Sequence, residues 1–285
     1  MANVSIIARP RKDCLGEGPL WSGRENALYW VDILGKRLNR LSLATGAIDE
    51  WVMPEMIGWV IEREHAPGFV AGLRSGLALL SLDPFGIQPI ATPEPDRPGN
   101  RMNDAKADAA GRIWAGTMPL NGDTPTGAFY RLDPDRTVTR VDDGYRIANG
   151  PAISADGAWL FHTDSGAHSI YRFAIRDDGA LGSRELFAAI DPALGAPDGM
   201  TIDADGRLWV AIWGGGRVVR FTPDGRIERE IALPASQITS CTFSGAKLDR
   251  MFITSASIGV DEAEGGTLFE VDPGCLGLPT LRYGG

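Results

Sequence analysis

The segment from Asp198 to Leu233, DGMTIDADGRLWVAIWGGGRVVRFTPDGRIEREIAL, decides the fold because it contains a complete unit of short strands. Its first apolar strand ends at an Asp-Gly turn (205–206), and residues 207–213, 217–222 and 227–233 form the next strands. Asp-Gly and Gly-Gly turns supply the positive φ that a tight hairpin needs. The segment therefore predicts a small sheet of consecutive antiparallel strands.

Similar units recur along the whole chain at spacings of 40 to 49 residues. They begin near Glu17, Ile57, Asn103, Asn149, Asp198 and Thr239. A strand-rich repeat of this length is typical of β-propellers, in which each blade is one sheet. The sequence predicts an all-β fold, a six-bladed β-propeller with four antiparallel strands per blade, formed by a single domain of residues 1–285.

The ends of the chain are expected to meet in this fold. Residues 4–8 have the apolar character of a strand and should pair with the last blade, which would close the ring. A β-sandwich or a two-domain all-β protein is the alternative architecture. It would not explain repeats that are spread over the whole length.

Composition limits the classes of partner. The chain is 44% hydrophobic and 23% charged, as in ordinary globular proteins, and no apolar run is long enough to span a membrane. A net charge of −9 without a basic stripe argues against nucleic acid. Scattered Cys14, Cys241 and Cys275 fit a reducing compartment, and the first residues lack a signal-peptide core. We therefore expect a cytoplasmic protein.

Polar side chains occupy the same place in four of the repeats: Glu17, Asn103, Asn149 and Asp198. In a propeller the innermost strand of each blade lines the central channel, so residues at the start of each repeat meet at the channel mouth. Two acids that converge on one axis require a partner, because buried carboxylates must be neutralised.

A divalent cation is the partner that this set predicts. Glu17 and Asp198 would balance its charge, and Asn149 would add a neutral carbonyl oxygen. Oxygen ligands favour Ca²⁺, Mg²⁺ or Mn²⁺ over a thiolate-type zinc site, and three protein ligands leave positions for water and substrate. The alternative is that these residues only cap turns between repeats. Their equivalent places in the repeats favour the metal.

Other catalytic motifs are not found. The chain has no G-x-S-x-G elbow, no G-x-G-x-x-G segment leading into a helix and no H-E-x-x-H pair. Its histidines are His65, His162 and His168. His162 lies within an apolar strand and is expected to be a packed residue, or one that supports the ligands, rather than a ligand itself. Nucleophilic catalysis by a Ser-His-Asp triad is therefore disfavoured.

Several short motifs together resemble one family. They are Leu15-Gly16-Glu17-Gly18-Pro19-Leu20-Trp21, Asn100-Arg101-Met102-Asn103-Asp104, residues 111–118 (GRIWAGTM), Asn149-Gly150-Pro151, His162-Thr163-Asp164 and Pro197-Asp198-Gly199. In order and spacing, from about residue 13 to 272, the chain resembles the senescence marker protein/regucalcin and gluconolactonase family. The resemblance implies a six-bladed propeller that holds one divalent metal in its channel and hydrolyses sugar lactones.

The resemblance also implies roles for individual residues. The family's metal ligands fall on Glu17, Asn149 and Asp198, and its substrate contacts fall on Arg101 and Asn103. Asp198 is in addition the aspartate to which acid/base work is assigned. Arg101 has an alternative interpretation as a surface ion-pair residue.

Two further positions are less clear in the sequence. Trp213 could form a wall of the pocket or could pack between blades. Some animal members carry a substrate-contacting acid where this chain has Asn121, so their sugar selectivity is not transferred.

The expected activity is metal-dependent opening of an aldonolactone, such as gluconolactone or xylonolactone, to the aldonic acid. The metal, which is Ca²⁺, Mn²⁺, Zn²⁺ or Fe²⁺ in such a family, would polarise the lactone carbonyl. Asp198 would carry a proton from the attacking water to the leaving hydroxyl, while Arg101 and Asn103 hold the sugar. The alternatives are hydrolysis of other lactones or organophosphates, and a non-catalytic calcium-binding regulator or interaction platform.

Overall fold

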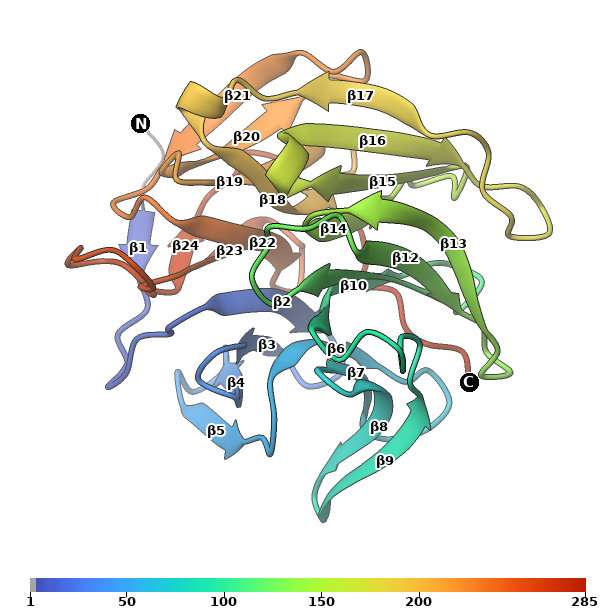
Figure 1. The fold of residues 1–285 in the computed structure, drawn as a ribbon. Coiled ribbons are helices and arrows are strands. Elements are labelled where there is room, and N and C mark those ends of the chain that lie inside the picture. Colours follow the sequence, from blue (N-terminus) through green and yellow to red (C-terminus); the bar gives the residue numbers. More distant parts are fainter. Residues whose placement is uncertain (1–3) are drawn as a thin grey trace.

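The computed structural model describes residues 4–285 and consists of six four-stranded sheets arranged around a central axis (Figure 1). Blade 1 contains β2 (Gly16–Ser22), β3 (Ala27–Asp32), β4 (Arg37–Ser42) and β5 (Ile48–Val52); blade 2 contains β6 (Ile57–Glu62), β7 (Phe69–Leu73), β8 (Gly76–Leu82) and β9 (Phe85–Ala91); blade 3 contains β10 (Asn100–Ala107), β11 (Ile113–Pro119), β12 (Gly127–Leu132) and β13 (Val138–Tyr145).

Blade 4 contains β14 (Ala148–Ile153), β15 (Trp159–Asp164), β16 (Ser169–Ala174) and β17 (Glu185–Ala189); blade 5 contains β18 (Ala196–Ile202), β19 (Leu208–Trp213), β20 (Arg217–Phe221) and β21 (Ile227–Ala232); blade 6 contains β22 (Ile238–Ser244), β23 (Arg250–Ser255), β24 (Phe269–Val271) and β1 (Val4–Ile6). The short 3-10 turns η1 (Ser165–Ala167) and η2 (Pro192–Leu194) complete the described secondary structure. The predicted six-bladed propeller is confirmed.

Blade 6 is built from both ends of the chain. β1 pairs antiparallel with β24, with Val4 opposite Val271 and Ile6 opposite Phe269. Ile7 extends this pairing by donating its backbone N–H to the carbonyl of Leu268 at 2.9 Å. The prediction that residues 4–8 close the ring is therefore confirmed for the strand that β1 forms.

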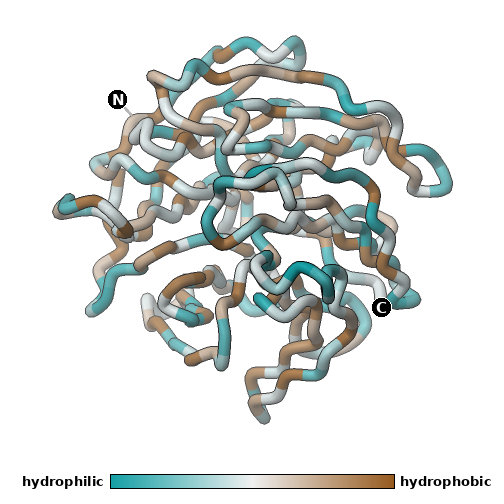
Figure 2. The backbone as a smooth tube through the Cα atoms, in the orientation of Figure 1, coloured by the Kyte–Doolittle hydropathy of each residue, from teal (hydrophilic) through white to brown (hydrophobic). Residues whose placement is uncertain are grey.

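The hydrophobic core is divided among the six interfaces between neighbouring blades. Each interface contains one cluster of buried side chains, so the clusters themselves form a closed ring. The largest fully buried side chains are Trp30, Trp59, Trp114 and Trp209. Hydrophobic stretches follow the strands, while many outer loops are hydrophilic (Figure 2). Because every blade buries both faces against its neighbours, the strands need apolar residues on both sides.

A buried aspartate fixes both the turn and the tryptophan in blades 3 and 5. Asp203 accepts hydrogen bonds from the backbone N–H of Arg207 at 2.9 Å and from Trp209 Nε1 at 2.9 Å. Asp108 does the same for the N–H of Arg112 at 3.0 Å and for Trp114 Nε1 at 2.7 Å. The repeated Asp-x-x-Gly-Arg-x-Trp pattern of the sequence is explained by this network.

All six inner strands carry a β-bulge near the start of the strand. The register of pairing shifts at Glu17/Leu20, Ile57/Trp59, Met102/Ala105, Asn149/Ala152, Pro197/Met200 and Ile238/Ser240. A bulge adds an unpaired residue and re-aims the side chains beside it. The repeat position that the sequence identified is therefore the position at which the inner strand leaves regular pairing.

The bulges of neighbouring blades pack closely around the axis. A Cβ on Gly58 would lie 2.7 Å from the carbonyl oxygen of Asn103, and a Cβ on Gly150 would lie 2.9 Å from that of Asp198. Gly150 also has a φ of +28°, which a side chain would strain. Glycine at these positions allows the inner strands to approach one another at the channel mouth.

The C-terminal segment, residues 272–285, crosses the end of the channel opposite to the bulges. Leu278 and Leu281 line a cavity of about 80 Å³ together with residues from five inner strands, including Ile153 and Phe243. Tyr283 is fully buried and donates its backbone N–H to the carbonyl of Glu62 at 2.9 Å. The segment thus covers one end of the channel and leaves the bulged end for ligands.

Candidate active site in the central channel

The bulges bring the four predicted polar residues into one buried group. Glu17 on β2, Asn103 on β10, Asn149 on β14 and Asp198 on β18 each have 5% of their surface exposed. Although they lie far apart in the sequence, three of their strands are neighbours around the channel, because β14 contacts both β10 and β18, while β2 contacts β6 and β22. The sequence prediction that these residues converge is consistent with this arrangement.

On one side of the channel, an arginine and an asparagine form a bonded pair. Arg101 donates from Nη1 to Asn103 Oδ1 at 2.7 Å, and Asn103 donates from Nδ2 to the carbonyl of Ala148 at 3.0 Å. Arg101 is 7% exposed and forms no ion pair among residues 4–285, so the interpretation of it as a surface ion-pair residue is wrong. Its guanidinium is held inside the channel mouth.

On the other side, an amide and a carboxylate are in direct contact. Asn149 Nδ2 donates to Asp198 Oδ1, and Asn149 Oδ1 accepts the backbone N–H of Gly150 at 3.0 Å. The carboxylate of Glu17 accepts the N–H of Gly18 at 3.0 Å. These contacts fix the side chains through the bulge that carries them, so each polar group is anchored to its own inner strand.

Burial raises the pKa of the acids in this group. It raises the pKa of Glu17 to about 8, with the nearby Asp104 carboxylate adding to the effect. Burial, followed by the charge of Glu17, raises the pKa of Asp198 well above its ordinary value. Burial lowers the pKa of Arg101 to about 10, although Glu17 and Asp198 oppose that change. Without a cation beside them, burial therefore favours the neutral forms of these acids, and a bound cation would restore their charge.

One further acid belongs to this group and was not singled out from the sequence. Asp104 is 7% exposed, its Oδ1 accepts the N–H of Ala105 at 2.7 Å, and burial raises its pKa. Its charge acts on both Glu17 and Asp198. The equivalent residues in blades 1, 4 and 5 are glycines, so an acid at this place in blade 3 was the signal that could have identified it.

The side chains of this group fit a divalent cation that prefers oxygen ligands. Glu17 and Asp198 supply two buried carboxylates without a fixed cation between them, and Asn149 supplies an amide oxygen. Among residues 4–285, no three His, Cys, Asp or Glu side chains are arranged to hold a metal ion by themselves, so a site here would depend on the amide oxygen of Asn149 as well. The ligand roles of Glu17, Asn149 and Asp198 remain predictions that this geometry supports.

His162 and Trp213 lie away from this group of acids. His162 is fully buried and stacks on Phe129 and Phe173 with ring centroids at 4.8 and 5.3 Å, which confirms it as a packed residue. Trp213 ends β19 opposite Ala196 and is partly exposed; its role as a pocket wall stays a prediction.

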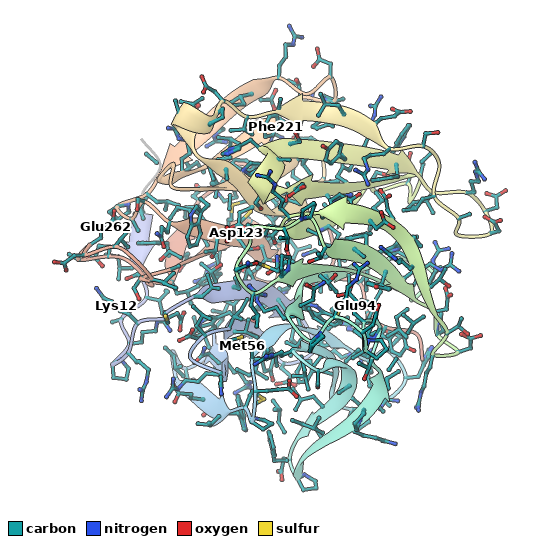
Figure 3. All side chains as sticks on the ribbon, in the orientation of Figure 1. Lys12, Met56, Glu94, Asp123, Phe221 and Glu262 are labelled. Atoms are coloured by element: carbon teal, nitrogen blue, oxygen red, sulfur yellow. The ribbon has the colours of Figure 1, made fainter. Side chains whose placement is uncertain are left out.

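Asn121 and the cysteines complete the placement of the residues considered from the sequence. Asn121 lies in the loop that follows β11, as does Asp123, whose side chain is labelled over the central part of the ring in Figure 3. The cysteines are all free, with Cys241 buried.

A groove leads away from the channel mouth beside Arg101. It has a volume of about 640 Å³ and is lined by the β5–β6 connection, the β7–β8 turn, the β9–β10 connection and the first residues of β10. Lys36 from the β3–β4 turn and Thr117 from β11 complete its wall. We call this cavity the mouth groove. Its inner end is formed by Arg101, which also bonds Asn103 in the channel.

No helix in residues 4–285 has the length and apolar character needed to cross a bilayer. The arrangement defines a β-propeller with a buried set of carboxyl, amide and guanidinium side chains at one end of its channel. Comparison with known proteins gives the family. Residues 15–257 match the family described as SMP-30/Gluconolactonase/LRE-like region, and the chain belongs to it.

Individual relatives match over most of their length. The chain is 38% identical over 280 residues to a pentonolactonase of Haloferax volcanii, with 94% of each chain covered. It is 37% identical over 252 residues to a 6-deoxy-6-sulfogluconolactonase of Pseudomonas putida, covering 88% of this chain and 86% of the relative. Lactonases are carboxylic ester hydrolases, the enzyme class expected from the sequence.

A solved structure agrees with the fold. A regucalcin from Agrobacterium tumefaciens, described as a calcium-binding protein, superposes with a TM-score of 0.92 at 27% identity, covering 98% of this chain and 96% of that chain.

Proposed function

We propose that this protein is a divalent-metal-dependent sugar lactonase that opens an aldonolactone to its aldonic acid. The observation that carries the proposal is the convergence of Glu17, Asn149 and Asp198 with the Arg101–Asn103 pair in one buried site. Relatives that cover nearly the whole chain are named as sugar lactonases, which supports the reaction class. The likeness to a regucalcin described as calcium-binding supports a divalent cation such as Ca²⁺.

The side chains of the channel divide into ligands and substrate contacts. Glu17, Asn149 and Asp198 would hold the cation, which when bound supplies Lewis-acid polarisation of the lactone carbonyl. Asn103 and Arg101, on the neighbouring strand β10, carry N–H groups beyond those bonded within the site, and these would hydrogen-bond the hydroxyls of the sugar. The buried position of the site excludes bulk water, which strengthens each of these polar contacts.

Proton transfer is assigned to Asp198. During hydrolysis, the water oxygen forms a bond to the carbonyl carbon and the ring C–O bond breaks. The Asp198 carboxylate accepts the proton of the attacking water and returns it to the ring oxygen as that oxygen leaves. The product carboxylic acid then loses its own proton to solvent, and one equivalent of acid appears for each lactone opened.

This acid release provides the test. Alkali uptake at constant pH is measured with a panel of aldonolactones, an acyl lactone and a phosphotriester, in Ca²⁺, Mn²⁺, Zn²⁺ and Fe²⁺, and is corrected for spontaneous hydrolysis. We expect aldonolactones to be opened far faster than the blank. If no aldonolactone exceeds the blank in any metal, the proposal is refuted. Tight metal binding without turnover would instead support a non-catalytic calcium-binding protein.

Substitutions separate the ligands from the rest of the surface. Glu17→Gln and Asp198→Asn keep the side-chain volume but remove one of the two charges that would balance the cation, so both bound metal and turnover should be lost. Glu230→Gln is the matched control, because Glu230 lies on β21, the outermost strand of blade 5, and pairs with Arg217 at 3.0 Å, away from the channel. Elemental analysis of each purified protein gives the metal content.

A further inference from the structure

We propose that the mouth groove binds an anionic group on the sugar lactone, so that the preferred substrates carry a phosphate, sulfonate or carboxylate at the end remote from the lactone carbonyl. The inference rests on the proposed lactonase function and adds a substrate class to it. The proposal is based on a set of four cationic side chains that lines one side of the site, two of which, Lys36 and Arg74, have no ion-pair partner among residues 4–285.

The groove and the channel share a wall. Arg101 forms the inner end of the mouth groove, and its Nη1 bonds Asn103 Oδ1 at 2.7 Å inside the channel. A lactone ring that bonds Asn103 therefore has the groove beside it. The volume of about 640 Å³ exceeds what the ring needs, so the groove has room for a substituent on the far end of the sugar.

Four cationic side chains line the mouth groove: Lys36, Arg74, Arg97 and Arg101. Within residues 4–285, no ion pair joins Lys36, Arg74 or Arg101 to a carboxylate. Arg97 is the exception, with Nη1 at 4.0 Å from Glu94 Oε1. In a chain with a net charge of −9, this groove is a local concentration of positive charge.

The acids of the groove are bonded to neutral donors. Glu55 accepts from the backbone N–H and the hydroxyl of Ser75, each at 2.7 Å. Glu94 accepts from Asn100 Nδ2 at 2.8 Å and from Tyr130 OH at 3.0 Å. Both carboxylates are thus held against the groove wall by hydroxyl and amide groups. Within the described part of the chain, Lys36 and Arg74 are left without an anion, whereas Arg101 lies near the carboxyl groups of Glu17 and Asp198.

The arginine side chains of the groove favour a ligand with several negatively charged oxygen atoms. A guanidinium presents N–H donors in a fork that matches the oxygen atoms of a phosphate, sulfonate or carboxylate. A positive groove at the mouth also raises the local concentration of an anionic substrate, whereas the acids deeper in the channel would repel it. A neutral lactone gains neither effect.

The experiment compares lactones that differ only at the remote carbon. Values of kcat/KM are measured for a neutral aldonolactone and for its derivatives with a terminal phosphate, sulfonate or carboxylate. We expect at least one anionic lactone to be favoured over the neutral one by about tenfold or more, because a hydrogen-bonded charged contact gives an advantage of that size. The three anionic arms show which group the groove prefers.

Variants locate the effect in the groove. Arg74→Gln and Lys36→Gln should each lower the ratio of anionic to neutral kcat/KM, Arg74→Gln by about tenfold, and added salt should lower the same ratio in the wild type. Lys12→Gln is the matched control, since Lys12 is an exposed cation on the other side of the ring from Glu94 in Figure 3 and should leave the ratio unchanged.

A second readout does not depend on turnover. The aldonic acid with a terminal phosphate is stable, and calorimetric titration should show that Arg74→Gln weakens its binding more than that of the unsubstituted aldonic acid. Equal kcat/KM for neutral and anionic lactones, with no response to either groove variant, would overturn the inference and leave the proposed lactonase intact. Failure to open any lactone would refute the proposed function and the inference with it.

Discussion

Replacing His162 with glutamine should change the pH dependence of stability. His162 lies on β15 between Phe129 and Phe173, and its Nε2 is 3.0 Å from the hydroxyl of Tyr145. Burial lowers the pKa of His162 from 6.5 to about 4. Tyr145 keeps a partner in the variant, because it also donates to Asp142 Oδ2. Glutamine removes the titration without exposing a buried hydroxyl.

The sign and size of the change in unfolding free energy with pH follow from the lowered pKa of His162. Between pH 6.5 and pH 4 the folded protein keeps the imidazole neutral, whereas the unfolded chain takes up a proton, so stability falls as the pH is lowered. The loss is about 1.4 kcal/mol per pH unit across that interval and about 3 kcal/mol in total. This is a large part of a typical folding free energy of about 5–15 kcal/mol. Above pH 6.5 His162 is neutral in both the folded and the unfolded chain, so this loss of stability is absent.

Urea unfolding at a series of pH values measures the effect. Other groups titrate in the same range, so the quantity of interest is the difference between wild type and His162→Gln. We expect the two curves of unfolding free energy to run parallel above pH 6.5, and the wild type to lose about 1.4 kcal/mol more per pH unit below it. Parallel curves over the whole range would show that the burial of His162 does not set its protonation.

The remaining predictions concern the site and its frame. Asn103→Ala removes a donor to the sugar and should lower kcat/KM by about tenfold or more; unchanged kcat/KM would remove Asn103 from the site. Because the substitution also removes the bonds to Arg101 and to the Ala148 carbonyl, urea unfolding should show a loss of about 1–3 kcal/mol. Trp209→Phe breaks the hydrogen bond to Asp203 and should cost about 1–3 kcal/mol in urea unfolding, whereas equal stability would contradict the role of that buried pair. Tyr283→Ala empties a fully buried position and should cost about 3–5 kcal/mol, measured in the same way; a loss below 1 kcal/mol would mean that the C-terminal segment adds little.

The repeat made most of the fold predictable. Turn residues at fixed offsets define where each strand ends, and the spacing from Glu17 to Thr239 leaves room for six blades. The predicted strand at residues 207–213 corresponds to β19, Leu208–Trp213. The single-domain assignment for residues 1–285 stays a prediction. Closure of the ring was foreseeable because the last blade lacked a fourth strand after β24.

The grouping of the four repeat residues at the channel mouth was predictable from the sequence, whereas their neighbours were not; their roles stay predictions. Equivalent repeat places identified Glu17 and Asp198, because the same bulge recurs in every inner strand. Asp104 was overlooked because it follows the repeat position instead of occupying it. The mouth groove could not be derived from the sequence at all. Lys36, Arg74 and Arg97 belong to three different loops, and only the packing of blades 1 to 3 brings them to one cavity.

The C-terminal segment covers one end of the channel, so that ligands can enter only at the bulged end. Leu278 and Leu281 lie across the far end, so under the proposed function lactone, water and aldonic acid would all pass the same opening beside Arg101. Inbound and outbound molecules then compete for one passage, and the outgoing aldonate always carries a negative charge past the cationic groove. A single opening lined by cationic side chains would therefore slow release of the aldonate product rather than opening of the lactone ring.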